Sequence, residues 1–306
     1  MTLPPLYLAP MAGVTDKPFR NMVRKFGKQT LFTEMIAVNS LLARHPGTVK
    51  LLDFTGEENL VVQLVGENPD KIAQAAKIVA DNGAASIDIN MGCPVKKLIS
   101  NCSGAKLMLY PEKAAQIVEK TVAAVHVPVS VKMRLGWDKE HINGVEFAKI
   151  LENAGAQRLT VHGRTKDQGY AGQADWQEIS KIKHSVSIPV IANGDIVNRS
   201  TAKTAAEITG ADGLMVGRGA CGKPWVLSEI ENGCRPEFNL SDLILEHFDA
   251  MLSYYGIHGV FVARKHLAWY GKGKKDVATF AQRVYAEKNI DKIKRMIKDF
   301  FDGQEA

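Results

Sequence analysis

The chain has 306 residues, of which 45% are hydrophobic and 24% are charged, and its formal net charge is +6 with an isoelectric point near 9.0. This composition excludes a disordered or low-complexity chain, and the length suits one large α/β barrel with a small appendage. The excess of positive charge permits a phosphate-rich partner without requiring one.

No apolar run approaches the length of a membrane span, and the N-terminal stretch, which Pro4, Pro5 and Pro10 interrupt, does not resemble a signal peptide. We therefore expect a cytoplasmic protein without membrane association. The four cysteines include no CxxC pair, and the eight histidines show no spacing typical of a zinc site. We expect free thiols and no bound metal.

Eight short apolar or β-branched runs, separated by stretches of helical periodicity, predict strands at residues 7–9, 31–35, 60–64, 86–90, 129–133, 158–162, 189–192 and 213–216. Most of them recur about every 30 residues, which is the length of one βα unit. Gly83, Gly155 and Gly210 stand at helix-to-strand joints, where a helix C-cap favours positive φ. Eight such units in succession favour a closed (β/α)8 TIM barrel over residues 1–239, and an open doubly wound sheet is the weaker alternative.

The pattern changes after Asn239, because from Ser241 onward the chain shows only helical periodicity. We predict a separate helical domain over residues 240–306. Between Arg264 and Lys298 the chain carries 11 Lys or Arg residues against three acidic ones. The segment 264–275 mixes cations with Trp269 and Tyr270, a composition typical of phosphate contacts interleaved with base stacking. The alternative is that both rings turn into the helical core.

Polar residues and glycines follow the predicted strands, and in a TIM barrel the chemistry lies at the C-terminal ends of the strands. Any one of these residues alone could be structural, but so many in register predict a shared site. They are Pro10, Met11, Ala12, Glu34, Gln63, Asn90, Cys93, Lys132, Arg134, His162, Arg164, Asn193, Gly194, Asp195, Gly217 and Arg218.

The glycine-rich loops 192–195 and 217–220 are typical of phosphate binding by backbone N–H groups, with Arg218 as a countercharge. Residues 217–222 also read GxGxxG. A dinucleotide-binding fold would continue into a second strand with an acidic residue about 20 positions later, whereas here Lys223-Pro224-Trp225 opens a helix. We therefore reject a Rossmann site for NAD.

Cys93 lies between Gly92 and Pro94, directly after a strand that is predicted to be buried. Proline fixes the local backbone and glycine allows close approach, which together would aim a reactive side chain. The alternative is a small buried hydrophobe, the usual role of a free cysteine. A proton donor at this position needs the thiol and not the thiolate. A disulfide with Cys102 is disfavoured in a reducing compartment.

The segments APMAGVTD (9–16), DINMGCP (88–94), KMRLGW (132–137), HGRT (162–165), NGDI (193–196) and GRG (217–219) resemble motifs of the bacterial tRNA-dihydrouridine synthases. The match runs in order across the whole predicted barrel and extends less sharply into the helical tail. No residue roles carry over to that tail, because it is variable in the family.

The resemblance implies an FMN cofactor and places residues around it. Pro10, Met11 and Ala12 would lie against the flavin ring, Gln63 and Lys132 would bond its polar edge, and His162, Asn193, Gly194, Asp195, Gly217 and Arg218 would face the ribityl phosphate. Cys93 matches the proton donor of the family, and Asn90, Arg134 and Tyr170 would line the pocket for uracil.

The implied reaction reduces the 5,6 double bond of a D-loop uridine in tRNA. NADPH would reduce FMN, hydride would pass from flavin N5 to C6 of uracil, and Cys93 would protonate C5. We expect tRNA as the partner and a monomeric protein.

Two other functions compete with this interpretation. One is an FMN barrel reductase that acts on a small molecule, against which the basic tail counts. The other is an RNA-binding protein whose barrel is only a scaffold, against which a bound flavin would count.

Overall fold

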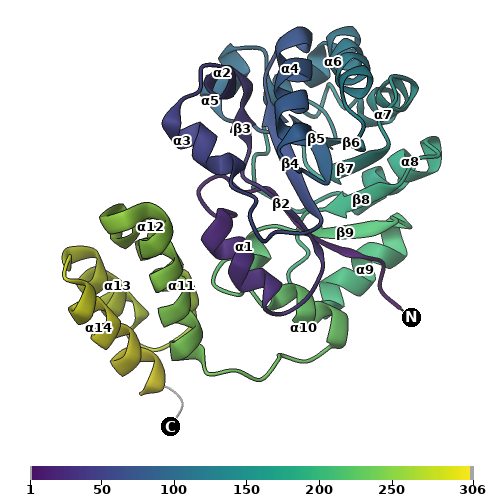
Figure 1. Cartoon of the computed structure of the whole chain (residues 1–306). Helices are drawn as coiled ribbons and strands as arrows, with labels where there is room; N and C mark the ends of the chain where they lie inside the picture. The colour runs from purple at the N-terminus through teal and green to yellow at the C-terminus, as the bar shows by residue number, and fades with distance from the viewer. Residues whose placement is uncertain (1, 304–306) are drawn as a thin grey trace.

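The computed structural model describes residues 2–303, in which a barrel of parallel strands is followed by a group of helices (Figure 1). The strands are β1 (Leu6–Leu8), β2 (Thr30–Phe32), β3 (Ile36–Ala37), β4 (Leu60–Val65), β5 (Ser86–Met91), β6 (Val129–Arg134), β7 (Arg158–His162), β8 (Val190–Asn193) and β9 (Gly213–Val216). They follow the order β2-β1-β9-β8-β7-β6-β5-β4-β3, and a further pairing of β2 with β4 closes the barrel. The predicted (β/α)8 fold is confirmed.

The second strand of the barrel differs from its prediction as one strand over residues 31–35. It consists of two pieces, β2 and β3, which both pair with β4. Between them the Thr33 hydroxyl accepts the backbone N–H of Gln63 at 3.2 Å and donates to the carbonyl of Glu34 at 2.7 Å. A threonine side chain that takes the place of a ladder carbonyl interrupts regular pairing, which period-two alternation does not reveal.

Helices lie on the outside of the barrel, and Figure 1 shows α4, α6, α7, α8 and α9 around it. Side-chain caps begin several of them: Asn68 accepts from Lys71 N at 3.0 Å, and Asp175 accepts from Glu178 N at 3.0 Å. The helices of this part are α1 (Lys17–Arg24), α2 (Val38–Leu42), α3 (Pro46–Val49), α4 (Pro69–Asp81), α5 (Lys96–Ser100), α6 (Pro111–Ala124), α7 (Gly144–Asn153), α8 (Trp176–Ser185), α9 (Arg199–Thr209) and α10 (Val226–Asn232), with the 3₁₀ turns η1 (Lys50–Leu52), η2 (Gly104–Leu109) and η3 (Arg218–Ala220).

Alternation along the strands separates two apolar layers. Phe32, Val61, Ile191 and Met215 form one cluster with Ala9, and Tyr7 packs against it. The neighbouring positions belong to a larger cluster shared with the surrounding helices. Because each strand residue points opposite to the next, the polar residues near the strand ends are held at defined depths in the barrel.

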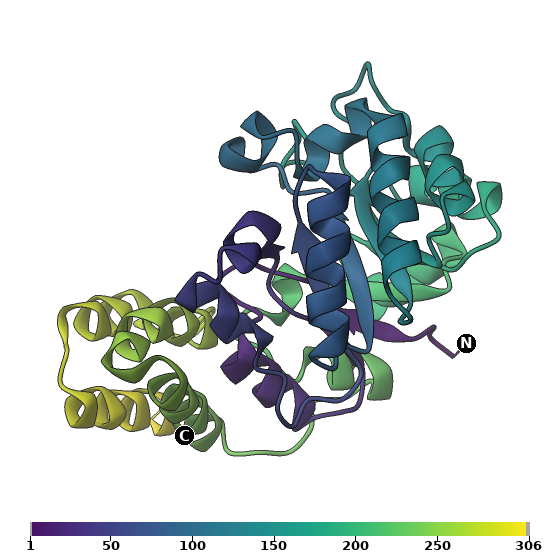
Figure 2. The same cartoon turned by 45° about the horizontal axis from the view of Figure 1, so that its top comes forward.

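The C-terminal region is helical, as predicted, and comprises α11 (Leu240–Tyr255), η4 (Gly256–His258), α12 (Gly259–Tyr270), α13 (Val277–Ala286) and α14 (Ile290–Asp302). Asn239 caps α11 by accepting from Asp242 N at 2.9 Å. The core of these helices also takes in Met22 of α1 and Trp225, and Figure 2 shows the helices beside α1, to one side of the barrel. A division into two domains at residue 239 stays a prediction, and residues 1 and 304–306 lie outside the described part.

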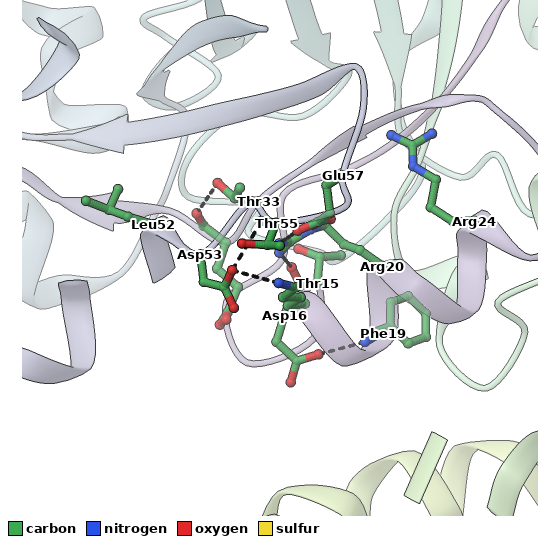
Figure 3. A network of polar contacts seen from close by, with 12 residues as sticks. Thr15, Asp16, Phe19, Arg20, Arg24, Thr33, Leu52, Asp53, Thr55 and Glu57 are labelled. Atoms are coloured by element: carbon green, nitrogen blue, oxygen red, sulfur yellow. Dashed lines mark hydrogen bonds and ion pairs between the residues drawn. The ribbon is translucent and has the colours of Figure 1, made fainter. Parts of the chain in front are cut away.

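A polar network surrounds the start of α1 (Figure 3), and its member Asp16 also contacts the C-terminal helices. The Asp16 carboxylate caps α1 at Phe19 N, 2.9 Å away, and accepts from the Tyr255 hydroxyl of α11 at 2.8 Å. Burial raises the pKa of Asp16 to about 6. Nearby, Arg20 forms a buried ion pair with Glu57, with Nε 2.7 Å from Oε1. The helical tail is therefore fixed to the loop that follows β1.

Candidate active site

The predicted site residues of five neighbouring strands meet at one rim of the barrel. Strand register sets Asn90 beside Lys132 and His162 beside Asn193. Gln63 is 1% exposed, and Asn90, His162 and Asn193 are 7–8% exposed. Because the strands are parallel, their C-terminal ends open on the same face, and these side chains line its interior.

Gln63, Asn90 and the Cys93 loop are connected by hydrogen bonds. Asn90 Oδ1 accepts the backbone N–H groups of Gly92 at 3.1 Å and Cys93 at 2.9 Å. Asn90 Nδ2 donates to Gln63 Oε1 at 2.8 Å, and Gln63 Nε2 donates to Asp88 Oδ2 at 2.7 Å. The side chains of β4 and β5 thus fix the first residues of the loop that carries the cysteine.

The Cys93 side chain is partly exposed, and the cysteine is not in a disulfide. Its carbonyl accepts from Ala105 N at 3.0 Å, so the loop closes back on itself. Burial raises the pKa of the Cys93 thiol above its ordinary value, although Arg134 and Lys132 act in the opposite direction. At neutral pH the group is a thiol, which is the form that a proton donor requires.

Lys132 places an ammonium group inside the barrel mouth. Its Nζ donates to Asn193 Oδ1 at 2.9 Å, and Asn193 Nδ2 donates to the Met215 carbonyl at 2.8 Å, which fixes the amide orientation. Burial lowers the pKa of Lys132 to about 8. Within the described residues no carboxylate forms an ion pair with it. The site therefore holds a cation that has hydrogen-bond capacity left for a ligand.

His162, at the end of β7, contacts Arg164, which in turn binds Asp195. Burial and the surrounding cations lower its pKa far below the ordinary value, so the ring is neutral. Arg164 Nη1 lies 3.3 Å from His162 Nε2. Because a guanidinium can only donate, Nε2 is the acceptor and the proton is assigned to Nδ1. The same guanidinium holds the Asp195 carboxylate at 2.9 and 2.8 Å.

The loops after β8 and β9 complete this side of the rim. Gly194 has φ +123, and a Cβ there would come within 2.7 Å of the Ala174 side chain, so only glycine fits. A Cβ at Gly217 would meet only the Ala9 side chain, at 3.7 Å, so its backbone is open to a close ligand. Arg218 next to it is 54% exposed and lies 3.7 Å from Asp195.

Arg134 and Tyr170 are both near the rim, but in different environments. Arg134 is 2% exposed and donates to the carbonyls of Gly92 at 2.7 Å, Thr165 at 2.7 Å and Gly169 at 2.9 Å. Tyr170 is 58% exposed, and the Arg218 guanidinium lies 4.6 Å from its ring centre. The arginine therefore holds together the loops after β5 and β7, whereas the tyrosine side chain is largely exposed to solvent.

Pro10, Met11 and Ala12 follow β1 at the same rim. Pro10 and Met11 are partly buried, Met11 against the barrel cluster, while Ala12 is exposed. The carboxylate of Glu34 accepts the N–H of Gly13 and so holds this loop. No direct contact joins these three residues to Gln63 or Lys132 in the hydrogen-bond and apolar contacts of residues 2–303.

Sequence reasoning placed Arg164 at the barrel mouth without a role, and it gave no role to Asp88. Asp88 is fully buried, and it stands two residues before Asn90 on the same face of β5. That alternation was a signal that could have found it. Arg164, 1% exposed, donates to the carbonyls of Ala171 and Gly172 and to Asp195, but backbone partners of this kind leave no mark in the sequence.

The basic segment of the tail approaches the rim through α12. A Cβ on Gly13 would lie 3.0 Å from Lys265 Nζ, so this lysine reaches the loop after β1. Burial raises the pKa of the Cys221 thiol, and the cations Arg218, Lys265 and Lys272 in its surroundings act in the opposite direction. Tyr270, by contrast, is 5% exposed, and its hydroxyl lies 3.0 Å from His247 Nδ1. The alternative that its ring turns into the helical core is correct for Tyr270.

Two further properties concern residues 2–303 as a whole. No helix of this part is long and apolar enough to cross a membrane. In the same residues, no group of three or more His, Cys, Asp or Glu side chains is placed to hold a metal ion.

Comparison with known proteins identifies close relatives. A family model described as dihydrouridine synthase (Dus) matches residues 7–302. A probable tRNA-dihydrouridine synthase of Rickettsia conorii is 44% identical over 97% of this chain and 93% of its own length. The tRNA-dihydrouridine synthase B of Xanthomonas axonopodis pv. citri is 40% identical over 98% of this chain and 93% of its own.

Two solved structures resemble the fold. Histamine dehydrogenase from Rhizobium sp. 4-9 aligns over 82% of this chain with a TM-score of 0.56 and 13% identity, and a 2-naphthoyl-CoA reductase aligns over 75% with a TM-score of 0.59 and 12% identity. The alignment covers 48% and 50% of those chains, so this chain spans about half their length. At such low identity the likeness shows the fold alone.

Proposed function

The chain belongs to the dihydrouridine synthase family, and on that premise we propose that it is a tRNA-dihydrouridine synthase that uses FMN and NADPH to reduce a D-loop uridine. The observation that carries this proposal is the convergence at one barrel rim of a protonated thiol, a partly buried ammonium group and a glycine-lined backbone cradle. NADPH and uridine would yield NADP⁺ and dihydrouridine, with one proton taken up.

The donor set of the rim fits FMN. Lys132 and Gln63, which has one amide proton left after bonding Asp88, would hold the polar edge of the ring. The ring would lie against Pro10, Met11 and Ala12. When bound, FMN supplies the hydride that is added to C6 of uracil.

The phosphate of FMN would lie at the other side of the rim. His162 would donate its Nδ1–H to the phosphate. Asn193 and Gly194 begin the glycine-rich loop after β8, Gly217 leaves its backbone open to a ligand, and Arg218 adds a positive charge. The Asp195 carboxylate would repel a phosphate, but it is engaged by Arg164 and by Ala174 N at 2.7 Å. We propose that Asp195 contacts the phosphate through its backbone N–H, and that its carboxylate orients Arg164 and Arg218.

Cys93 would supply the proton to C5 of the uracil. Its raised pKa keeps the proton on sulfur at neutral pH, and the bond from Cys93 N to Asn90 Oδ1 fixes the backbone from which the thiol projects. Asn90 and Tyr170 would line the uracil pocket. Arg134 has only Nη2 left for a ligand after its three bonds to carbonyls, so its main contribution is to hold the Cys93 loop at Gly92.

A target base inside a folded tRNA must leave its stack to reach this rim, at a cost of a few kcal/mol. The cations Lys265, Lys272 and Arg218, all in the surroundings of Cys221, support binding of the RNA backbone at this rim, because Lys and Arg contacts to phosphate provide most of the affinity for nucleic acids. A reductase for small molecules would not need such a cationic rim, and an RNA-binding scaffold would not need the buried Lys132.

The experiment is to purify the full chain, identify the cofactor released on denaturation, and add NADPH to the native protein. We expect FMN near one per chain, with its visible absorption bleached by NADPH and restored by undermodified tRNA. A protein purified without flavin would argue for the RNA-binding alternative. Flavin that a small enone reoxidises but tRNA does not would argue for the small-molecule reductase.

A further inference from the structure

Asp88 is a fully buried carboxylate deeper in the barrel than the proposed catalytic thiol. Its Oδ2 accepts from Gln63 Nε2 at 2.7 Å and its Oδ1 accepts from Ser130 Oγ at 2.7 Å. Neither the reaction proposed above nor the site residues predicted from the sequence give it a role. Its position at the end of the hydrogen-bond chain from Cys93 suggests one.

The chain of bonds runs in one direction only. The backbone N–H groups of Gly92 and Cys93 donate to Asn90, Asn90 donates to Gln63, and Gln63 donates to Asp88. An amide side chain can turn over and exchange donor for acceptor, so Gln63 and Asn90 do not define this direction themselves. The two ends define it, because a backbone N–H can only donate and a carboxylate can only accept.

We propose that Asp88 is a positioning residue that, as the terminal acceptor, fixes the amide orientations of Gln63 and Asn90 and through them the backbone of Cys93. The inference deepens the proposed function and rests on it for the role of the thiol. It also assigns which atoms Gln63 presents to the rim: the second proton of Nε2 and the second lone pair of Oε1.

Two variants of Asp88 separate this role from others. Asp88→Asn keeps the shape of the side chain and an acceptor oxygen for Gln63. Its new N–H groups can donate to Ser130 Oγ, because the Ser130 hydroxyl can donate instead to the Ile87 carbonyl, 3.3 Å away. Asp88→Leu has a similar size but no acceptor. If only the filled volume mattered, both variants would behave like the natural chain, and if only the negative charge mattered, both would be impaired.

The measurement is the rate at which iodoacetamide alkylates Cys93 in the purified full chain, read by peptide mass spectrometry. Cys234 is exposed and provides an internal reference in the same sample. Loss of a buried hydrogen bond loosens the loop by roughly tenfold in equilibrium. We therefore expect Asp88→Leu to raise the Cys93 rate roughly tenfold, and Asp88→Asn to stay within about twofold of the natural rate.

An Asp88→Leu rate that is not raised, or an Asp88→Asn rate that rises as much, would overturn the proposal. If Asp88→Leu does not fold, Gln63→Met interrupts the same chain at its middle member and should raise the Cys93 rate by a similar factor; an unchanged rate there also overturns it. Alkylation needs neither tRNA nor turnover, so its outcome is distinguishable from a failure of the proposed reaction.

Discussion

Replacing Lys132 by methionine should change how the stability of the FMN-free protein depends on pH. The folded pKa of Lys132 is about 8, against 10.5 for an ordinary lysine, because burial disfavours the charged form. Below pH 8 the folded chain therefore carries a desolvation penalty. A shift of this size corresponds to roughly 3 kcal/mol, and we reduce it to about 2 kcal/mol because Lys132 keeps partial contact with solvent at the rim.

The sign follows from proton binding. Between pH 8 and pH 10.5 the folded chain binds fewer protons at Lys132 than the unfolded chain, so the free energy of unfolding rises with pH over this window. Lys132→Met has no such group. The variant also leaves Asn193 Oδ1 without its donor, which lowers stability by an amount that does not depend on the charge of Lys132.

Urea unfolding of both proteins at about pH 7 and about pH 10 isolates the titration. The difference in unfolding free energy, natural chain minus variant, should rise by about 2 kcal/mol between the two pH values, because constant terms and titrating groups that do not interact with Lys132 cancel. A difference that stays constant within about 0.5 kcal/mol would refute the assignment of a desolvated cation at this rim.

Three further predictions concern the thiol, the junction and the tail. Cys93→Ala should retain FMN and tRNA binding but lose turnover, as followed by dihydrouridine formation, and a variant with full rate removes Cys93 from the mechanism. Asp16→Asn should have a free energy of unfolding about 2 to 3 kcal/mol above that of the natural chain at pH 7 but nearly the same at pH 4, because raising the pH through the folded pKa of about 6 destabilises only the natural chain. Equal differences in urea unfolding at both pH values would contradict this. Lys265→Glu should raise the KM for tRNA about tenfold or more without affecting reduction by NADPH, whereas Lys77→Glu on the exposed face of α4 should not; equal effects would exclude a specific contact.

Much of the fold follows from local patterns. Seven of the strands lie within a residue or two of their predicted bounds, because a buried parallel strand bounded by turn residues is a strong local signal. The second strand differs from its prediction because it is divided at Thr33, whose hydroxyl accepts from Gln63 N, 30 residues later in the chain. A pattern within one strand contains no information about such a partner.

The candidate site was predictable where side chains follow strand ends, and less so where they bind the backbone. Gln63, Lys132 and His162 point into the rim because alternation dictates it. The roles of Arg134 and Arg164 depend on carbonyl groups of loops 165–172, and those loop conformations cannot be derived from composition. Tyr270 shows the same limit, since burial of its ring depends on His247 in another helix.

We propose that the side chains at this rim reduce a uridine in tRNA. The most direct measurement is mass spectrometry of nuclease fragments from undermodified tRNA that has been incubated with the purified protein and NADPH. We expect one D-loop fragment to become heavier by two hydrogens with the natural chain and to stay unchanged with Cys93→Ala. Fragments that keep their mass with an FMN-loaded natural chain would contradict it.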